Sequence, residues 1–142
     1  MFPKFRAWCK HITGEGWFMC REVRWLNLET QTICTESGMQ PSEFVLMQYT
    51  GVNDCKRTDK YPKGQPIYDG DIVIVNYGMK DRQGNIINEQ NCEDRLAVIV
   101  FEDGVFTHGW CEPYLDGDLL LVVGNIYENR DLLKWPTLNP DE

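Results

Sequence analysis

The sequence predicts a mainly β protein whose short strands form a small barrel or roll. Short apolar runs recur along the chain, and the clearest one, Ile72–Val75, is a β-branched run typical of a strand buried on both faces. Gly, Asp, Asn and Pro residues separate these runs as turn formers. Roughly seven to nine strands at this spacing are typical of a small barrel or roll.

Two strands are expected near the beginning of the chain. Alternation in Phe5–Cys9 places Arg6 and Trp8 on the face opposite Cys9. After a Gly-rich turn, a second strand is expected to begin at Trp17 and to continue beyond a bulge as far as Trp25.

Two further strands precede a polar segment. Gln31–Thr35 is short and edge-like, and Glu43–Thr50 is a longer strand that Gly51 is expected to end. Residues 52–66 are rich in polar and turn-forming residues. They are therefore expected to form an exposed loop that reaches away from the strands.

The central strand opens the second half of the chain. The turn before it is Asp69-Gly70-Asp71, because Gly accepts positive φ and Asp side chains bond nearby backbone N–H groups. A hairpin-like turn is expected at residues 80–85, followed by a strand over Leu96–Phe101. Asp103-Gly104 then predicts a tight hairpin into Val105–Thr107.

The last elements are a strand and a short helical turn. Residues 116–118 repeat the Asp-Gly-Asp turn chemistry and are expected to begin a strand over Leu119–Val123. Asn129 is expected to cap a helical turn over residues 130–134, with Asp131 near its positive end.

The length of 142 residues predicts one domain spanning residues 1–142. It divides into an N-terminal β portion (1–51), the exposed loop (52–66), a barrel portion (67–135) and a frayed tail (136–142). No export signal and no membrane-length apolar run is seen, so a cytoplasmic location is expected. Six scattered cysteines are therefore expected to be free thiols.

The net charge of −8 is unevenly distributed. Residues 1–62 contain eight Lys/Arg and seven Asp/Glu, whereas residues 63–142 contain six and fifteen. The acidic second half is expected to repel a phosphate backbone. Solubility explains such a charge, and an acidic protein that occupies a basic groove is the alternative.

Two sets of residues are candidates for contact with a partner. The polar loop carries a local group of cations, and the N-terminal strands carry three tryptophans: Lys56, Arg57, Lys60, Lys63, Trp8, Trp17 and Trp25. Tryptophans in such strands normally pack in a core, whereas surface aromatics beside cations stack on nucleic-acid bases.

No catalytic, cofactor or metal site is expected. Cys9 with His11 and His108 with Cys111 would form a Cys2His2 zinc site if the two segments met, but neither spacing is usual for zinc. Nucleophile elbows, P-loops and dinucleotide fingerprints are not seen. Acidic pairs such as Asp69 with Asp71 lie at turns, which explains them without acid–base chemistry.

Four blocks in this order resemble the YopX family of phage and prophage proteins. They are Phe5–Trp8, then Leu46–Gly51 leading after a loop to Ile67–Val73, then Val100–Phe106, and last Val123–Asn129 before Leu132-Leu133. The resemblance implies an SH3-like barrel or roll in residues 67–135, a phage or prophage origin, and no assigned activity or catalytic residues. The sequence departs from the family pattern at Val52–Pro66, which is longer than usual and contains Cys55.

These observations favour a non-enzymatic phage or prophage accessory protein that binds a host or phage protein in the bacterial cytoplasm. A single-stranded nucleic-acid-binding module, using the basic loop and the N-terminal tryptophans, is the alternative. Binding or sequestering of a small ligand is a third hypothesis. Edge strands and abundant aromatics make a homo-oligomer plausible, and no membrane partner is expected.

Overall fold

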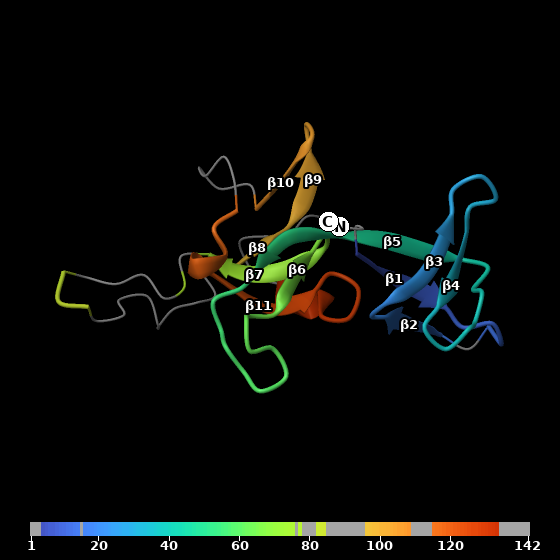
Figure 1. The fold of residues 1–142 in the computed structure, drawn as a ribbon, viewed down its shortest axis with the longest axis horizontal. Helices are drawn as coiled ribbons and strands as arrows, with labels where there is room; N and C mark the ends of the chain where they lie inside the picture. The colour runs from blue at the N-terminus through green and yellow to red at the C-terminus, as the bar shows by residue number, and fades with distance from the viewer. Residues whose placement is uncertain are drawn as a thin grey trace. The chain divides into compact units, whose positions relative to one another are not determined.

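The computed structural model describes residues 4–14, 16–75, 77, 82–84, 96–108 and 115–133 (Figure 1). The chain divides into two compact units, unit 1 (Met1–Tyr49) and unit 2 (Thr50–Glu142). Both are built from β-strands, and the only helices within the described residues are short 3-10 turns. The predicted mainly β class is confirmed.

Unit 1 contains an antiparallel sheet in which β1 (Phe5–Lys10) lies between β2 (Trp17–Cys20) and the first part of β5 (Phe44–Asn53). Ala7 is paired with Cys20 on β2 and with Leu46 on β5. Because side chains alternate along a strand, this register places Ala7, Cys20 and Leu46 on the same face.

A second, two-stranded sheet of unit 1 consists of β3 (Val23–Asn27) and β4 (Thr32–Thr35). Ile33 of β4 is fully buried with Ala7, Cys9 and Cys20 of the larger sheet. The expected continuation of the second strand to Trp25 is wrong, because the chain bends at Arg21–Glu22. The segment after the bend pairs with β4 instead, and the expected bulge lies within that pair.

Unit 2 is built around β7 (Asp71–Val75), which pairs with β11 (Leu120–Asn125) on one side and β8 (Leu96–Val98) on the other (Figure 1). All five residues of β7 are buried, as the β-branched run predicts. The core of the unit joins this strand to its neighbours through Ile67, Val73, Val75, Ala97, Ile99 and Leu120.

The predicted strand over Leu96–Phe101 is instead two strands that meet at Ile99. The first is β8, and the second is β9 (Val100–Glu102), which pairs with β10 (Val105–Thr107). Ile99 donates its N–H to the Asp71 carbonyl at 2.9 Å and accepts a bond from the Gly70 N–H at 2.8 Å. These bonds to the central turn redirect the chain, so the two strands join different sheets.

The hairpin between β9 and β10 is confirmed. Asp103 and Gly104 both have positive φ, at 53° and 85°. This is the backbone of a tight turn that matches the twist of paired strands. In Figure 1 the hairpin projects from the rest of unit 2.

β5 does not end at Gly51, as the sequence predicts, but runs on to Asn53. Gly51 takes a φ of 89° within the strand. Residues 54–65, called the basic loop below, follow it and lead into β6 (Pro66–Tyr68), which neighbours β5 in the sheet order. The prediction of a wholly exposed loop is wrong at its base, because Asp54 and Gly64 are buried.

The final elements are η2 (Gly117–Leu119), β11 and η3 (Arg130–Leu133), where η denotes a 3-10 turn. Asp116 caps η2 by accepting a bond from the Asp118 N–H at 3.1 Å. The helical turn after Asn129 is present. However, Oδ1 of Asn129 accepts a hydrogen bond from the Asn125 N–H at 3.1 Å. The expected side-chain cap of η3 is therefore replaced by a bond back to the end of β11.

Three predictions remain open. The described strands form open sheets of four, three, two and two strands, so an SH3-like barrel stays a prediction. The division into portions at residues 51, 66 and 135 also stays a prediction. Residues 80, 81 and 85 of the expected turn, and the whole tail at 136–142, lie outside the described residues.

Candidate binding surface

One face of the unit 1 sheet packs on the core, and the opposite face carries tryptophan. Trp8 is paired with Met19 on β2 and with Val45 on β5. By alternation along the strands, Trp17, two residues before Met19, lies on the same side. We call Trp8, Trp17, Met19 and Val45 the tryptophan face. The prediction that Trp8 lies opposite Cys9 is confirmed, because Cys9 packs in the core on the other face.

Trp8 and Trp17 form a stacked pair on this face. Their ring centroids lie 6.2 Å apart and their planes differ by 14°. Trp8 is half-buried, whereas Trp17 is 42% exposed. The stack holds the Trp17 ring in one orientation, so its exposed surface is already ordered before a partner arrives.

A groove of ≈ 680 Å³ adjoins Trp17 at the end of the sheet. Its apolar lining comes from three strands and the β3–β4 connection, namely Trp17, Leu26, Leu28, Phe44, Val45 and Leu46. Polar groups of Asn27, Gln31, Ser42 and Glu43 complete it. A groove lined by apolar side chains with a few polar groups is typical of a binding site.

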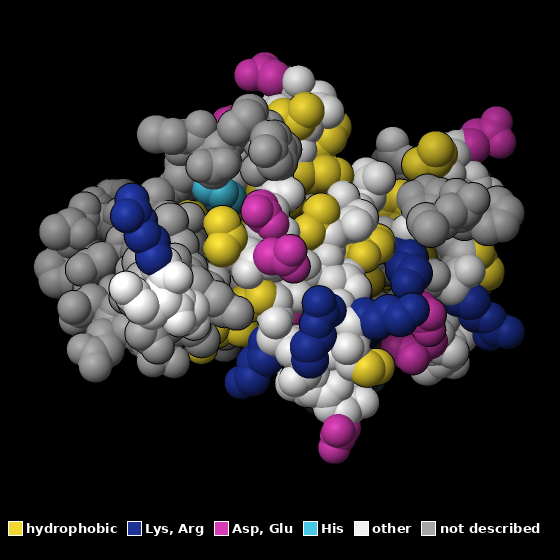
Figure 2. Space-filling view, turned by 60° about the vertical axis from the view of Figure 1, so that its left-hand side comes forward, with side chains coloured by type: hydrophobic (Ala, Val, Ile, Leu, Met, Phe, Trp, Pro, Cys, Tyr) yellow, Lys and Arg dark blue, Asp and Glu magenta, His cyan; other side chains and the backbone are white. Residues whose placement is uncertain are grey.

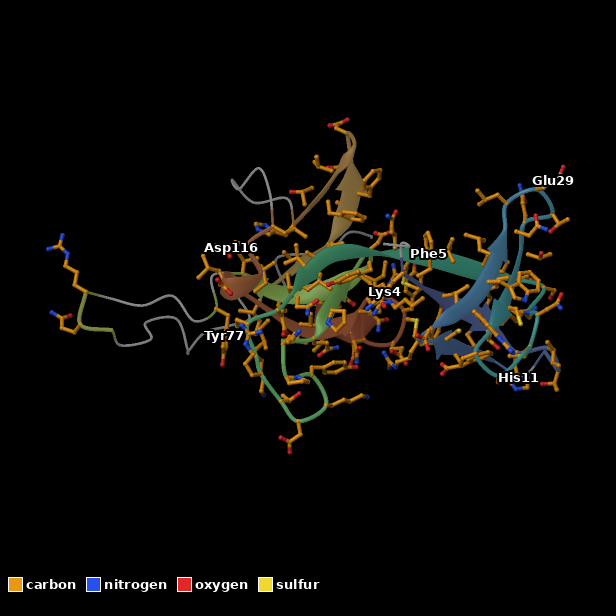
Figure 3. All side chains as sticks on the ribbon, in the orientation of Figure 1. Lys4, Phe5, His11, Glu29, Tyr77 and Asp116 are labelled. Atoms are coloured by element: carbon orange, nitrogen blue, oxygen red, sulfur yellow. The ribbon has the colours of Figure 1, made fainter. Side chains whose placement is uncertain are left out.

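Two of the lining side chains are strongly exposed for apolar residues. Leu28 is 79% exposed and Val45 is 39% exposed. Figure 3 shows the labelled Glu29, the next residue after Leu28, at the tip of the β3–β4 hairpin. Exposed apolar side chains that gather at one groove indicate an interaction site more strongly than the same residues scattered singly.

Trp25 is separate from this groove. It is 43% exposed on β3, but its neighbours Leu26 and Asn27 line the groove and Trp25 does not. The three tryptophans predicted as contacts therefore divide into a stacked pair, of which Trp17 lines the groove, and one exposed side chain outside the groove.

Arg6, two residues before Trp8 on β1, lies on the same side of the sheet, as predicted, but in an unusual position for a cation. Its side chain is only 4% exposed, and its Nε lies 3.4 Å from Met47 Sδ. A buried guanidinium is retained only where its donors are engaged. Arg6 is therefore a buried residue on this side of the sheet and offers no exposed cation beside the tryptophans.

The predicted cationic contacts lie together on the basic loop of unit 2. Lys56, Arg57, Lys60 and Lys63 are all exposed. Lys60 Nζ lies over the Tyr61 ring, 5.4 Å from its centroid. The cations and the tryptophans thus belong to different units, so the structure does not show them as one surface.

The residues of the hypothetical zinc site are also divided. His11 follows the end of β1, as labelled in Figure 3, and its Nδ1 lies 2.9 Å from Thr13 Oγ1. His108 belongs to unit 2, and Cys111 lies outside the described residues. Across the described ranges, no group of three or more His, Cys, Asp or Glu side chains is placed to hold a metal ion.

Cys9 is a core thiol rather than a reactive one. Burial raises the pKa of its thiol to about 11, and the neighbouring Cys20 adds to the increase. Burial also raises the pKa of the Cys55 thiol, with Asp54 adding to the effect. Reactive cysteines have depressed pKa values, so neither thiol is prepared as a nucleophile.

Sequence reasoning missed Leu28 and Val45 as groove residues, as well as Asp54, which anchors the basic loop. Alternation in β5 places Val45 opposite Leu46, which is the only signal that would have found it. None of the helices in the part of the chain that the structure describes has both the length and the hydropathy of a membrane span.

Comparison with known families shows that the model described as YopX protein matches residues 4–134. The chain is also similar to a solved structure, the crystal structure of protein EF1440 from Enterococcus faecalis, with a TM-score of 0.58 and 25% sequence identity. That similarity covers 94% of this chain and 99% of the other. No curated protein matches the chain.

Proposed function

The chain belongs to the YopX family, and from this premise we propose that it is a non-enzymatic phage or prophage accessory protein that acts by binding a protein partner. Membership itself indicates no biochemical activity. The similar structure comes from a bacterium, Enterococcus faecalis, and the proposal includes action in a bacterial cytoplasm. We include in the proposal an SH3-like roll over residues 67–135, which the antiparallel order β11-β7-β8 supports.

The observation that carries the proposal is the exposed Trp17 ring, stacked on Trp8 and forming one wall of the groove. Tryptophan is among the residues that contribute most to protein–protein affinity, particularly beside a pocket that excludes water. The stack also reduces the entropy that Trp17 would lose on binding. Leu28 and Val45 add further exposed apolar surface to the same groove.

The test is a pull-down from host lysate with the full chain, compared across three variants. We expect a stoichiometric partner at physiological salt, and a loss of affinity of about 30-fold in Trp17→Ala. Leu28→Arg places a charge at the groove and should weaken binding about tenfold with little effect on folding, because Leu28 is 79% exposed. Trp25→Ala is the matched control, since Trp25 has the same exposure as Trp17 but lies outside the groove.

Two results would contradict the proposal. One is the absence of any stoichiometric partner, and the other is equal loss of the partner in Trp17→Ala and Trp25→Ala. Thermal unfolding of each variant separates lost binding from lost folding. Size-exclusion chromatography with light scattering shows whether the partner is a second copy of the chain.

Single-stranded nucleic acid remains the second hypothesis, because four exposed cations lie on one loop. A fluorescence titration with single-stranded oligonucleotides at low salt separates it from protein binding. Micromolar affinity together with quenching of tryptophan would favour the nucleic-acid hypothesis over the proposed one.

A further inference from the structure

The basic loop is closed at its base by one backbone and one side-chain hydrogen bond between its two ends. The Asp54 N–H donates to the Gln65 carbonyl at 2.9 Å, and the Gln65 N–H donates to Asp54 Oδ1 at 2.8 Å. Asp54 Oδ2 accepts from the Val122 N–H at 3.0 Å, and the Cys55 N–H donates to the Leu120 carbonyl at 2.9 Å. The loop is therefore tied to β11, a strand of the unit 2 core.

The tip of the loop is also ordered by its own bonds. Thr58 and Tyr61 exchange two of them, since the Thr58 N–H donates to the Tyr61 carbonyl and the Tyr61 N–H donates to Thr58 Oγ1. The Gly64 N–H donates to the Tyr61 carbonyl at 3.0 Å. Gly64 has a φ of 94°, and a Cβ placed on it would collide with the Asp54 carbonyl. A compact surface loop with joined ends and internal bonds is an Ω-loop, a class of loop that is frequently functional.

The ordered loop carries charge opposite to that of the rest of the molecule. Its four cations are exposed, whereas one of its two carboxylates, Asp54, is buried in the loop base. The remainder of the chain holds ten of the 14 Lys/Arg and twenty of the 22 Asp/Glu. None of the four cations forms an ion pair with a residue that the structure describes. In Figure 1 the basic loop extends below β6. In Figure 2 dark blue side chains lie around the lowest protrusion of the surface.

We infer that the basic loop binds a short acidic segment of a partner protein. The loop backbone is already ordered, so it loses little conformational freedom when its cations bind carboxylates, and opposite charge speeds the encounter. A nucleic-acid strand fits less well, because its backbone would extend beyond the loop over a chain whose other residues are strongly acidic. The inference is independent of the groove in unit 1, because it rests on other residues.

A fluorescein-labelled octaglutamate peptide tests this surface directly with the full chain. We expect it to bind at low ionic strength, to be released as salt rises, and to bind more tightly than labelled octathymidylate. Lys56→Gln with Lys60→Gln should weaken peptide binding about fivefold or more. The matched control is Arg24→Gln with Arg130→Gln, which removes two exposed cations elsewhere and should change the affinity by less than about twofold.

Gly64→Ala tests whether the ordered shape of the loop matters, because it changes no charge. We expect weaker peptide binding in this variant, and if it does not fold, the two double variants decide alone. Three results would overturn the inference: no peptide binding at low salt, equal effects of the two double variants, or tighter binding of octathymidylate. Peptide binding unchanged in a folded Gly64→Ala protein would also overturn it. The peptide titrations use only the purified chain and a synthetic peptide. Their failure is therefore distinguishable from a failure of the pull-down that tests the groove proposal.

Discussion

Asp54 accepts a hydrogen bond from the backbone N–H of Val122, 68 residues further along the chain, through Oδ2 at 3.0 Å. The carboxylate is 3% exposed, and its other oxygen accepts bonds from the N–H groups of Lys56 and Gln65. A single side chain thus joins the end of β5, both ends of the basic loop and β11. Bonds to a charged acceptor are stronger than neutral ones, so this residue is expected to stabilise unit 2 disproportionately.

Asp54→Ala should lower the free energy of unfolding by about 3 kcal/mol, because it leaves three backbone N–H groups without their acceptor. Urea denaturation measures the change. Asp59→Ala is the control, since Asp59 is exposed in the same loop, and should cost under about 0.5 kcal/mol. Equal effects of the two substitutions would show that the Asp54 bonds contribute no net stability.

Gly117→Ala should be more destabilising than an exposed glycine substitution. A Cβ on Gly117 would collide with the Asn53 carbonyl and crowd the Val52 side chain, so the start of η2 would have to move from β5. Overpacking of this kind costs about 1–3 kcal/mol. Gly38→Ala is the comparison, because Gly38 has open space around it and its cost of about 1 kcal/mol comes only from its φ of 92°. Thermal unfolding of the two variants gives the order, and a larger cost at Gly38 would contradict the close packing of Gly117.

Cys9 should make the protein less stable in alkaline solution. Burial raises the pKa of its thiol from 9.0 to about 11, so the folded protein keeps a proton that the unfolded chain releases. The contribution of the protonated Cys9 thiol to the free energy of unfolding is fully present below pH 9 and is lost as the pH rises towards 11. Over that range the unfolded state binds fewer protons than the folded state. Urea denaturation between pH 8 and 11 measures this slope.

The control for this prediction is Cys9→Ala, which removes the thiol and should give a shallower slope over the same range. A slope as steep as that of the native chain would assign the pH dependence to other groups. In a separate variant that keeps Cys9 and carries Cys92→Ser and Cys111→Ser, thiol reagents should react with the half-buried Cys55 before the buried Cys9, Cys20 and Cys34.

Strands were predictable from sequence wherever the signal was local. Alternation in Phe5–Cys9, the β-branched run at Ile72–Val75 and the Asp103-Gly104 turn each depend on neighbouring residues, and the structure contains all three elements. The division of the chain at Ile99 was not predictable. Ile99 is apolar like its neighbours, and its break depends on backbone bonds to Gly70 and Asp71, distant in sequence.

The candidate site shows the same limit. The sequence indicates which residues of β1 share a face with Trp8. Which face of the sheet is exposed depends on the packing of β3 and β4 against the other face. Asp54 gave no signal, because in the sequence it is one carboxylate in a polar run. Its role arises only when β11 is brought beside the loop.

Asn125→Ala should unravel the turn that follows β11. Asn125 is 4% exposed, and its Oδ1 accepts bonds from the N–H groups of Tyr127 and Glu128 at 3.0 and 2.8 Å. Its amide also donates to Glu128 Oε1 at 2.9 Å. Alanine therefore removes both the acceptor of the two backbone N–H groups and the amide that contacts Glu128. We expect a loss of about 2 kcal/mol in the free energy of unfolding. Faster hydrogen exchange should be confined to the amides of Tyr127 and Glu128.

Arg130→Ala is the control for Asn125, because Arg130 is exposed a few residues further along and should leave exchange at both amides unchanged. Glu128→Gln separates the two roles of Asn125. It keeps an acceptor oxygen for the Asn125 amide, so the turn should persist with a loss under about 1 kcal/mol. If Glu128→Gln were as destabilising as Asn125→Ala, the contact between the two side chains, rather than the two backbone bonds, would hold the turn.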